Sequence, residues 1–180
     1  MKNLNNILTF IRLKIHYRHR KVFFNKLFKQ EDPYKTQNRD FEQAKLSSIL
    51  EVIKDRQYEN ALEIGCGEGF LTVQLLKYCK NVIGMDIAQT AIQRAKKQCK
   101  EESIVFKCGN IVDYTPDKIF NLIVAVDVCY YLAQEHSWRH IEEEFSKWVD
   151  WLDVKGRIVL LNCFNEKSHP KDWLGKHIME

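Results

Sequence analysis

The chain has 180 residues, of which 45% are hydrophobic and 29% charged, a balance typical of one globular domain with a sizeable core. No apolar run approaches the roughly 18 residues that cross a bilayer, and the charged N-terminus does not resemble a signal peptide. We therefore expect a cytoplasmic protein. The six cysteines form no C-x-x-C pair, so we expect free thiols rather than a zinc or disulfide framework.

The net charge of +4 is unevenly distributed along the chain. Residues 1–30 contain eight lysines or arginines and no acidic side chain, so the remainder carries 20 basic and 24 acidic side chains. An acidic body does not resemble a nucleic-acid groove, and we expect no nucleic-acid partner. For residues 1–30 two interpretations stay open. They form a cap or packing helix with solvated charges, or they make a peripheral contact with a membrane or an acidic partner.

The first part of the chain predicts two helices. Residues 4–28 have apolar side chains at helical spacing, with Phe23 and Leu27 on the apolar face. A break follows at Pro33, because the residue before a proline avoids the helical conformation. A second helix is predicted over residues 39–55, with Phe41 on its buried face.

From residue 60 onward, short apolar runs alternate with helical patterns. The predicted strands are residues 61–64, 81–86, 103–108, 120–126 and 156–162. The predicted helices are residues 71–78, 90–100, 138–152 and a short one at 172–178. Alternation of this kind predicts an α/β fold with a Rossmann-like parallel sheet and helices on both of its faces.

The segment after the first strand carries the strongest chemical signal. It contains Glu63, Gly65, Cys66, Gly67 and Gly69, so glycines recur two residues apart behind a carboxylate. Dinucleotide enzymes use G-x-G-x-x-G, which brings a helix N-terminus to a pyrophosphate. A carboxylate aimed into such a loop would repel a pyrophosphate. The loop suits a ligand that bears an ammonium and a sulfonium.

Two further loops complete a nucleoside pocket at the carboxyl edge of the sheet. Asp86 ends the second strand, 21 residues after Gly65, where an acidic side chain can accept hydrogen bonds from ribose hydroxyls. A simple helix cap is the alternative role. Asn110 and Ile111 follow the third strand and are placed to accept from the adenine amino group and to cover the ring.

The loop after the fourth strand is placed at the rim where cofactor and substrate meet. It contains Asp127, Tyr130 and Tyr131, and His136 lies just beyond it. His136 and His140 stand four residues apart, on one face of a helix, but no third ligand lies close by. We therefore expect no metal site there and treat His136 as a candidate substrate contact.

At these loops the chain resembles the class I S-adenosylmethionine-dependent methyltransferases, over about residues 60–163. The resemblance implies S-adenosyl-L-methionine as cofactor. It implies contacts from Glu63, Gly65, Gly67 and Gly69 to the methionine part, from Asp86 to the ribose, from Asn110 and Ile111 to the adenine, and from Asp127 on the far side. Cys66 and Ile87 are implied as further cofactor-binding residues. Many members have Asp in place of Asn110, so we expect weaker cofactor binding.

Upstream motifs resemble one family within this class. Three motifs are similar to those of the nodulation protein S family: Asp32-Pro-Tyr34, Phe-Glu42-x-x-Lys45, and the segment that begins at Asp127 at the end of the fourth strand. Those enzymes are N-methyltransferases that act on a free amino group of a chitin-type oligosaccharide. The resemblance implies that Tyr34 and Lys45 cap the cofactor, and that the acceptor is an oligosaccharide or another small molecule.

The expected organisation is a cap over residues 1–57 and a cofactor-binding domain over residues 58–180, in one structural unit. Members of the class continue past the fifth strand, so the C-terminal edge of the sheet is expected to be truncated. Two alternatives to an amine methyltransferase stay open: a small-molecule O-methyltransferase, and a truncated methyltransferase-like binding module without activity.

Methyl transfer from a sulfonium is an in-line displacement, so alignment is the main task of the enzyme. Alignment can supply roughly 7–11 kcal/mol, whereas a general base adds about 10²–10⁴-fold. We expect Glu42 and Asp127 to orient the acceptor, with Tyr34, Tyr130 and Tyr131 walling the path of the methyl group.

Overall fold

Five parallel strands form one sheet in the order β3-β2-β1-β4-β5, in a computed structural model that describes residues 18–133 and 138–162. The strands are β1 (Tyr58–Ile64), β2 (Cys79–Asp86), β3 (Ile104–Cys108), β4 (Phe120–Val126) and β5 (Leu152–Leu161). The order reverses between β1 and β4, which creates a crevice at their carboxyl ends. The predicted Rossmann-like parallel sheet is confirmed.

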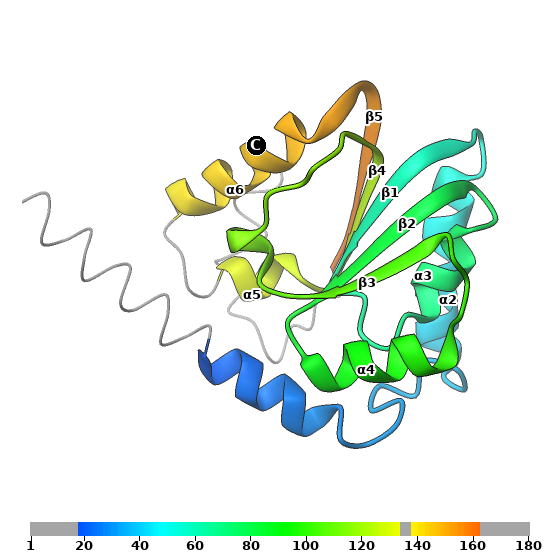
Figure 1. Ribbon diagram of the computed structural model, residues 1–180, viewed down its shortest axis with the longest axis vertical. Helices are drawn as coiled ribbons and strands as arrows, with labels where there is room; N and C mark the ends of the chain where they lie inside the picture. The colour runs from blue at the N-terminus through cyan, green and yellow to red at the C-terminus, as the bar shows by residue number, and fades with distance from the viewer. Residues whose placement is uncertain (1–17, 134–137, 163–180) are drawn as a thin grey trace, which may run out of the picture.

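Helices cover both faces of this sheet (Figure 1). One face is covered by α2 (Asp40–Ile53), α3 (Phe70–Leu75) and α4 (Gln89–Gln98), and the other by α5 (Cys129–Ala133) and α6 (Trp138–Asp150). A 3₁₀ turn, η1 (Ile111–Asp113), follows β3.

The interior strand β4 shows why the sheet lies between two helical layers. Leu122 and Val124 pack with α2, α3 and α4, while Ile123 and Ala125 pack with the α5 and α6 side. All four are fully buried. Burial of each large side chain contributes about 1.5–3 kcal/mol, so this continuous apolar run is stable only between two helical layers.

Some element boundaries differ from the predicted ones. Helix α3 ends at Leu75 rather than at Tyr78, because β2 already begins at Cys79. Strand β5 begins at Leu152, four residues earlier than predicted, and its pairing with β4 includes a register shift. The rim segment after β4, predicted as a loop, contains the short helix α5.

The first helix is confirmed over residues 18–27, and the rest of its predicted span lies outside the described residues. We call residues 18–27 the cap helix and residues 18–36 the cap. The predicted apolar face was wrong at Phe23, which is 59% exposed, because Phe24 and Phe28, four residues apart, turn inward instead. Phe41 was also expected to be buried, but it is 55% exposed.

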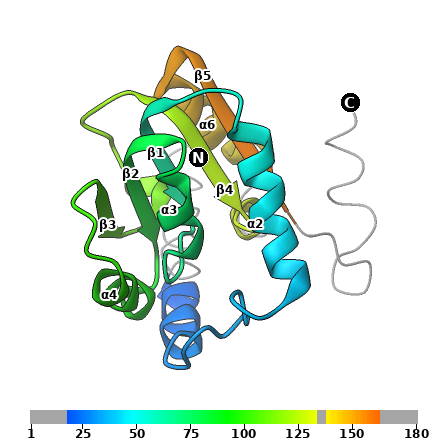
Figure 2. The same ribbon diagram turned by 90° about the vertical axis from the view of Figure 1, so that its right-hand side faces the viewer.

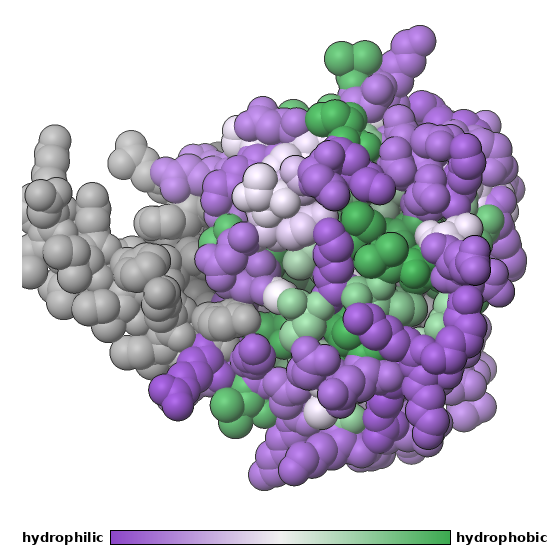
Figure 3. Space-filling model, in the orientation of Figure 1, coloured by the Kyte–Doolittle hydropathy of each residue, from purple (hydrophilic) through white to green (hydrophobic). Residues whose placement is uncertain are grey.

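The surface in Figure 3 is hydrophilic over most of the face in view, with hydrophobic side chains gathered near its centre. Within the described part of the chain, no helix has the length and apolar character to cross a membrane. The five cysteines among the described residues are free thiols.

Candidate functional site

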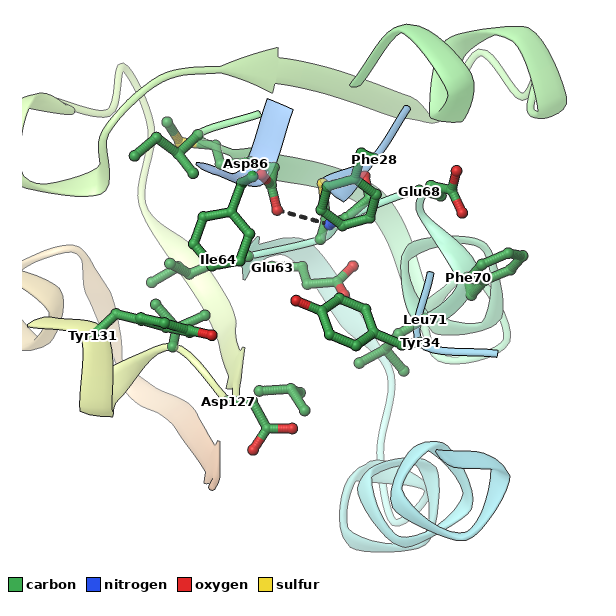
Figure 4. A pocket seen from close by; sticks show the side chains of 18 of the residues that line it. Phe28, Tyr34, Glu63, Ile64, Glu68, Phe70, Leu71, Asp86, Asp127 and Tyr131 are labelled. Atoms are coloured by element: carbon green, nitrogen blue, oxygen red, sulfur yellow. Dashed lines mark hydrogen bonds between the residues drawn. The ribbon is translucent and has the colours of Figure 1, made fainter. Parts of the chain in front are cut away.

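A pocket of about 390 Å³ lies at the carboxyl ends of β1, β2 and β4, where the strand order reverses. This volume is within the usual range for small-molecule sites. The glycine loop after β1 forms its floor, the loops after β2, β3 and β4 form its walls, and the cap closes it from above. Figure 4 shows Tyr34 of the cap, Asp86 after β2 and Tyr131 after β4 arranged around a common space.

The glycine loop adopts a backbone that side chains other than glycine rarely adopt. Gly65, Gly67 and Gly69 have φ angles of 78°, 53° and 83°. A Cβ at Gly65 would lie 2.3 Å from Val128, and a Cβ at Gly69 would lie 2.8 Å from Phe106. The loop is therefore shaped both by left-handed turns and by close contact with neighbouring side chains.

Asp86 holds the glycine loop to the end of β2. Its Oδ2 accepts a hydrogen bond from the Gly67 N–H at 2.9 Å (Figure 4). Its Oδ1 accepts one from the Ala88 N–H at 2.7 Å. Burial raises the pKa of the Asp86 carboxyl, while the N–H donors oppose that shift. The side chain thus tightens the turn before α4, and its remaining lone pairs line the pocket.

Glu63 is a buried carboxyl at the centre of the site. It is 3% exposed and accepts a hydrogen bond from the Thr72 hydroxyl. Burial raises the pKa of Glu63 to about 7, and the nearby charge of Asp86 adds to the increase. A cation placed in the pocket would restore the ionised form, so Glu63 favours a positively charged ligand.

A charged triad lies on the opposite side of the pocket. The Lys45 ammonium on α2 lies 2.7 Å from Glu42 Oε2 and 2.7 Å from Asp127 Oδ2. Burial lowers the pKa of Lys45, but the hydrogen bonds and charges of Asp127 and Glu42 outweigh it and raise the pKa overall. Asp127 has a φ of 53°, a conformation that Asp tolerates better than most residues.

Aromatic side chains of the cap form the roof. Phe28 packs edge-on against Tyr34, with ring centroids 6.0 Å apart, and Phe24 packs edge-on against Tyr131 at 5.2 Å. Arg20 donates a hydrogen bond from Nη1 to the Tyr131 carbonyl at 3.1 Å. The cap is therefore joined to the rim segment after β4.

The structure brings most of the predicted site residues together. The pocket is lined by Tyr34, Glu42, Lys45, Glu63, Gly65, Cys66, Gly67, Asp86, Ile87, Asn110, Ile111, Asp127 and Tyr131. Gly69 lies outside this lining, where it allows α3 to approach β3. The Tyr130 side chain and His136 lie outside the described residues.

Asn110 has a second role that the sequence did not reveal. Its Oδ1 accepts a hydrogen bond from the Val112 N–H at 3.3 Å and so caps the 3₁₀ turn η1. The same oxygen was expected to accept from an adenine amine. Both contacts require that one amide oxygen serve two donors, which its two lone pairs allow.

Glu68 is an unpredicted buried carboxyl in the same loop. It is 4% exposed, yet it contacts the cap through Asp32 and α4 through Arg94. Burial raises its pKa, while the Asp32 N–H and the Arg94 charge oppose that shift. A Glu between two glycines gave no signal of such contacts, because both partners are distant in sequence.

The charge of the lining decides which ligands fit. Six acidic side chains line the pocket against two basic ones, Arg20 and Lys45, and of the acids Glu68 is paired with Arg94 outside the lining; the acids are Asp32, Glu42, Glu63, Glu68, Asp86 and Asp127. This excess would repel a pyrophosphate and attract a cation. Together with the apolar side chains of Ile87 and Ile111, the lining fits a cationic nucleoside better than a dinucleotide.

The sheet order and the pocket define the class I methyltransferase fold, which solved structures confirm. N-methyltransferase NodS from Bradyrhizobium japonicum WM9, in complex with S-adenosyl-L-homocysteine, superposes with a TM-score of 0.71 at 25% identity, covering 78% of this chain and 71% of that one. Phosphoethanolamine N-methyltransferase 1 of Haemonchus contortus superposes with a TM-score of 0.74 at 20% identity, covering 87% of this chain and 34% of that one. The second likeness shows the fold alone.

The chain belongs to the nodulation protein S (NodS) family, whose family model matches residues 18–162. Nodulation protein S of Sinorhizobium fredii is 35% identical over 104 residues, which are 57% of this chain and 48% of that protein. The chain spans about half the length of the curated relatives it matches. The resemblance predicted from the Asp32-Pro-Tyr34 and Glu42-x-x-Lys45 motifs is confirmed.

Proposed function

We propose that the chain is an S-adenosylmethionine-dependent methyltransferase that methylates an amino group of a saccharide or another small molecule. The observation that carries the proposal is the acidic, partly apolar pocket at the switch point of the sheet. The likeness to NodS supports it, because that N-methyltransferase was solved with S-adenosylhomocysteine.

The residues present fit that cofactor, because each of its parts has residues of the pocket lining that can contact it. Glu63, Gly65, Cys66 and Gly67 would hold the methionine part, and Asp86 with Ile87 the ribose. Asn110 and Ile111 would hold the adenine, with Tyr34 above and Lys45 at the side toward α2. When bound, the cofactor supplies a methyl group on a positively charged sulfur.

The protein's own task is to align the acceptor amine, which becomes reactive after it has lost a proton to bulk water. An alkylamine with a pKa of about 10.4 is deprotonated in only one part in about 10³–10⁴ at pH 7, a cost of roughly 4–5 kcal/mol. Asp127 and Glu42 lie at the rim, where their oxygens can accept hydrogen bonds from the amine and fix its lone pair. Alignment of this kind can offset the cost.

Amine transfer is favoured over O-methylation by the lining. A sugar hydroxyl is far less acidic than an ammonium, so its methylation requires a committed base. Both rim carboxylates, Glu42 and Asp127, are paired with Lys45, which weakens them as bases. Small-molecule O-methylation therefore remains the second candidate.

The test is transfer of a radiolabelled methyl group to a panel of deacetylated chitooligosaccharides, amino sugars and small phenols. We expect label in amines and none in phenols, and loss of label in Asp127→Ala. Label in phenols alone would support the O-methyltransferase. Cofactor binding without transfer to any acceptor would support a binding module without activity.

We further propose that residues 1–57 as a whole cover the cofactor-binding residues 58–180. We also propose that the outer side of the cap helix contacts an anionic membrane. Val22 and Phe23 are 64% and 59% exposed, beside the exposed side chains of Arg18 and Lys26. Apolar groups among basic ones suit an anionic lipid surface. Co-sedimentation with phosphatidylserine vesicles should fall in a Val22→Ser/Phe23→Ser variant; equal sedimentation would contradict the contact.

A further inference from the structure

The side chain of Glu68 joins the glycine loop to the cap. Its Oε2 accepts a hydrogen bond from the Asp32 N–H at 2.8 Å, and its Oε1 accepts one from Arg94 Nη1 at 3.2 Å. Figure 4 shows its carboxylate pointing away from those of Glu63 and Asp86. The backbone of Glu68 therefore belongs to the loop under the pocket, while its side chain binds the cap above the pocket.

Arg94 extends this connection to a second point of the cap. It lies on α4, and its Nη2 donates a hydrogen bond to the Lys29 carbonyl, while its Nη1 pairs with Glu68. One guanidinium thus bridges the glycine loop and the end of the cap helix. Its fixed fork of donors suits this double contact better than a single ammonium would.

The rest of the cap is attached to the same elements. Asn25 on the cap helix accepts a hydrogen bond from the Thr90 N–H at 3.0 Å, and so satisfies a free donor in the first turn of α4. Helix α4 has no cap from its own N-cap residue, Ala88. Phe28 approaches Gly67, where a Cβ would lie 3.4 Å from the ring. Figure 2 shows the cap helix lying against α4.

These contacts matter because the cap supplies much of the pocket. Seven residues of the lining come from it: Arg20, Phe24, Phe28, Asp32, Pro33, Tyr34 and Thr36. A ligand of nucleoside size beneath them would contact the cap, so movement of the cap would widen its way out. Any group that ties the cap to the loop therefore slows that exit.

We propose that Glu68 and Arg94 are positioning residues that latch the cap onto the glycine loop and thereby retain the bound cofactor. This proposal rests on the proposed function. The latch acts through Asp32 and Lys29 rather than by contact with the reacting atoms. Because the loop and the cap share Glu68, ordering of the loop around a ligand also holds the roof closed.

The main test measures the dissociation rate of S-adenosylhomocysteine by stopped-flow displacement. Glu68→Ala and Arg94→Ala are each expected to release it about ten-fold faster, equivalent to about 1.4 kcal/mol. Glu68→Gln, which keeps an acceptor for the Asp32 N–H, should recover part of the loss. The double variant should release it at least as fast as either single variant, because each single variant leaves one of the two cap contacts, Glu68 with Asp32 or Arg94 with Lys29, in place.

The matched control is Glu59→Ala, which removes an exposed ion pair with Lys80 far from the cap. If S-adenosylhomocysteine left Glu68→Ala as slowly as it leaves this control, the proposal would be overturned. A lower melting temperature of Glu68→Ala would not change that conclusion.

A second readout does not depend on cofactor binding. Amide hydrogen exchange of residues 29–36 in the free protein should accelerate in Glu68→Ala and stay unchanged in Glu59→Ala. If wild-type protein failed to bind S-adenosylhomocysteine, the proposed function would fail, and the exchange data would still judge the latch. Unchanged exchange at Asp32 would overturn it.

Discussion

Lys45 on α2 and Asp127 after β4 are joined by an ion pair of 2.7 Å across 82 residues of sequence. The same ammonium contacts Glu42 at 2.7 Å, so one cation balances two carboxylates at the rim of the pocket. The Lys45 and Glu42 side chains are each 13% exposed, and that of Asp127 is 30% exposed. The pair fixes α2 against the end of β4.

Replacement of Lys45 by Met should destabilise the protein by about 1–2 kcal/mol, because it leaves two adjacent carboxylates unbalanced. Urea denaturation measures this change. The matched control is Lys80→Met, whose pair with Glu59 is exposed and should contribute less than about 1 kcal/mol. Equal losses in the two variants would show that the rim pair has no special role.

Asp127→Asn separates charge from backbone shape. Asn tolerates the left-handed conformation that Asp127 adopts, so this variant should fold as stably as wild type within about 1 kcal/mol. Its methyl transfer should fall by about 10–100-fold, because an amide orients the acceptor amine less well. Thermal melting and initial rates measure the two effects. Unchanged turnover would remove Asp127 from the proposed site.

Gly65→Ala should destabilise the protein by about 2–4 kcal/mol. It combines a left-handed strain of about 1–2 kcal/mol with overlap at Val128. Adding Val128→Ala to the Gly65→Ala variant should recover only the stability lost through overlap with Val128. Gly109→Ala is the control, since its Cβ would meet Met85 at an ordinary 3.5 Å and its φ is not left-handed. Equal unfolding free energies for Gly65→Ala and Gly109→Ala would contradict this prediction.

The raised pKa of Glu63 predicts a pH-dependent stability. Its folded pKa is about 7 and its ordinary value 4.5, so the folded state holds this proton more tightly. That contribution is complete below about pH 4.5 and is lost as the pH rises through 7. Glu63→Gln should therefore gain about 2–3 kcal/mol relative to wild type between pH 5 and pH 8. Urea denaturation of both proteins at the two pH values measures this change. The same difference in unfolding free energy between Glu63→Gln and wild type at pH 5 and at pH 8 would contradict the burial of this carboxyl.

Sequence reasoning found the parts of the site whose signals are local. The spacing of Gly65 and Gly67 behind Glu63, and of Asp86 at the next strand end, places them at one sheet edge once the strands are known to be parallel. The alternating strands and helices were predicted for the same reason, because hydrophobic periodicity is a property of short windows.

The connections between the cap and the sheet could not be predicted. Glu68 with Asp32, and Asn25 with Thr90, pair residues 36 and 65 positions apart, and a single sequence has no pattern that joins them. The inward turn of Phe24 rather than Phe23 was missed because the helix faces a pocket roof, not a continuous core.

Isothermal titration of the wild-type protein and of Asp86→Ala with S-adenosylmethionine and with NAD tests the pocket most directly. The acidic lining predicts binding of S-adenosylmethionine, at least ten-fold weaker binding in Asp86→Ala, and no heat with NAD. Binding of NAD by the wild-type protein, or silence with S-adenosylmethionine, would contradict a pocket built for a cationic nucleoside.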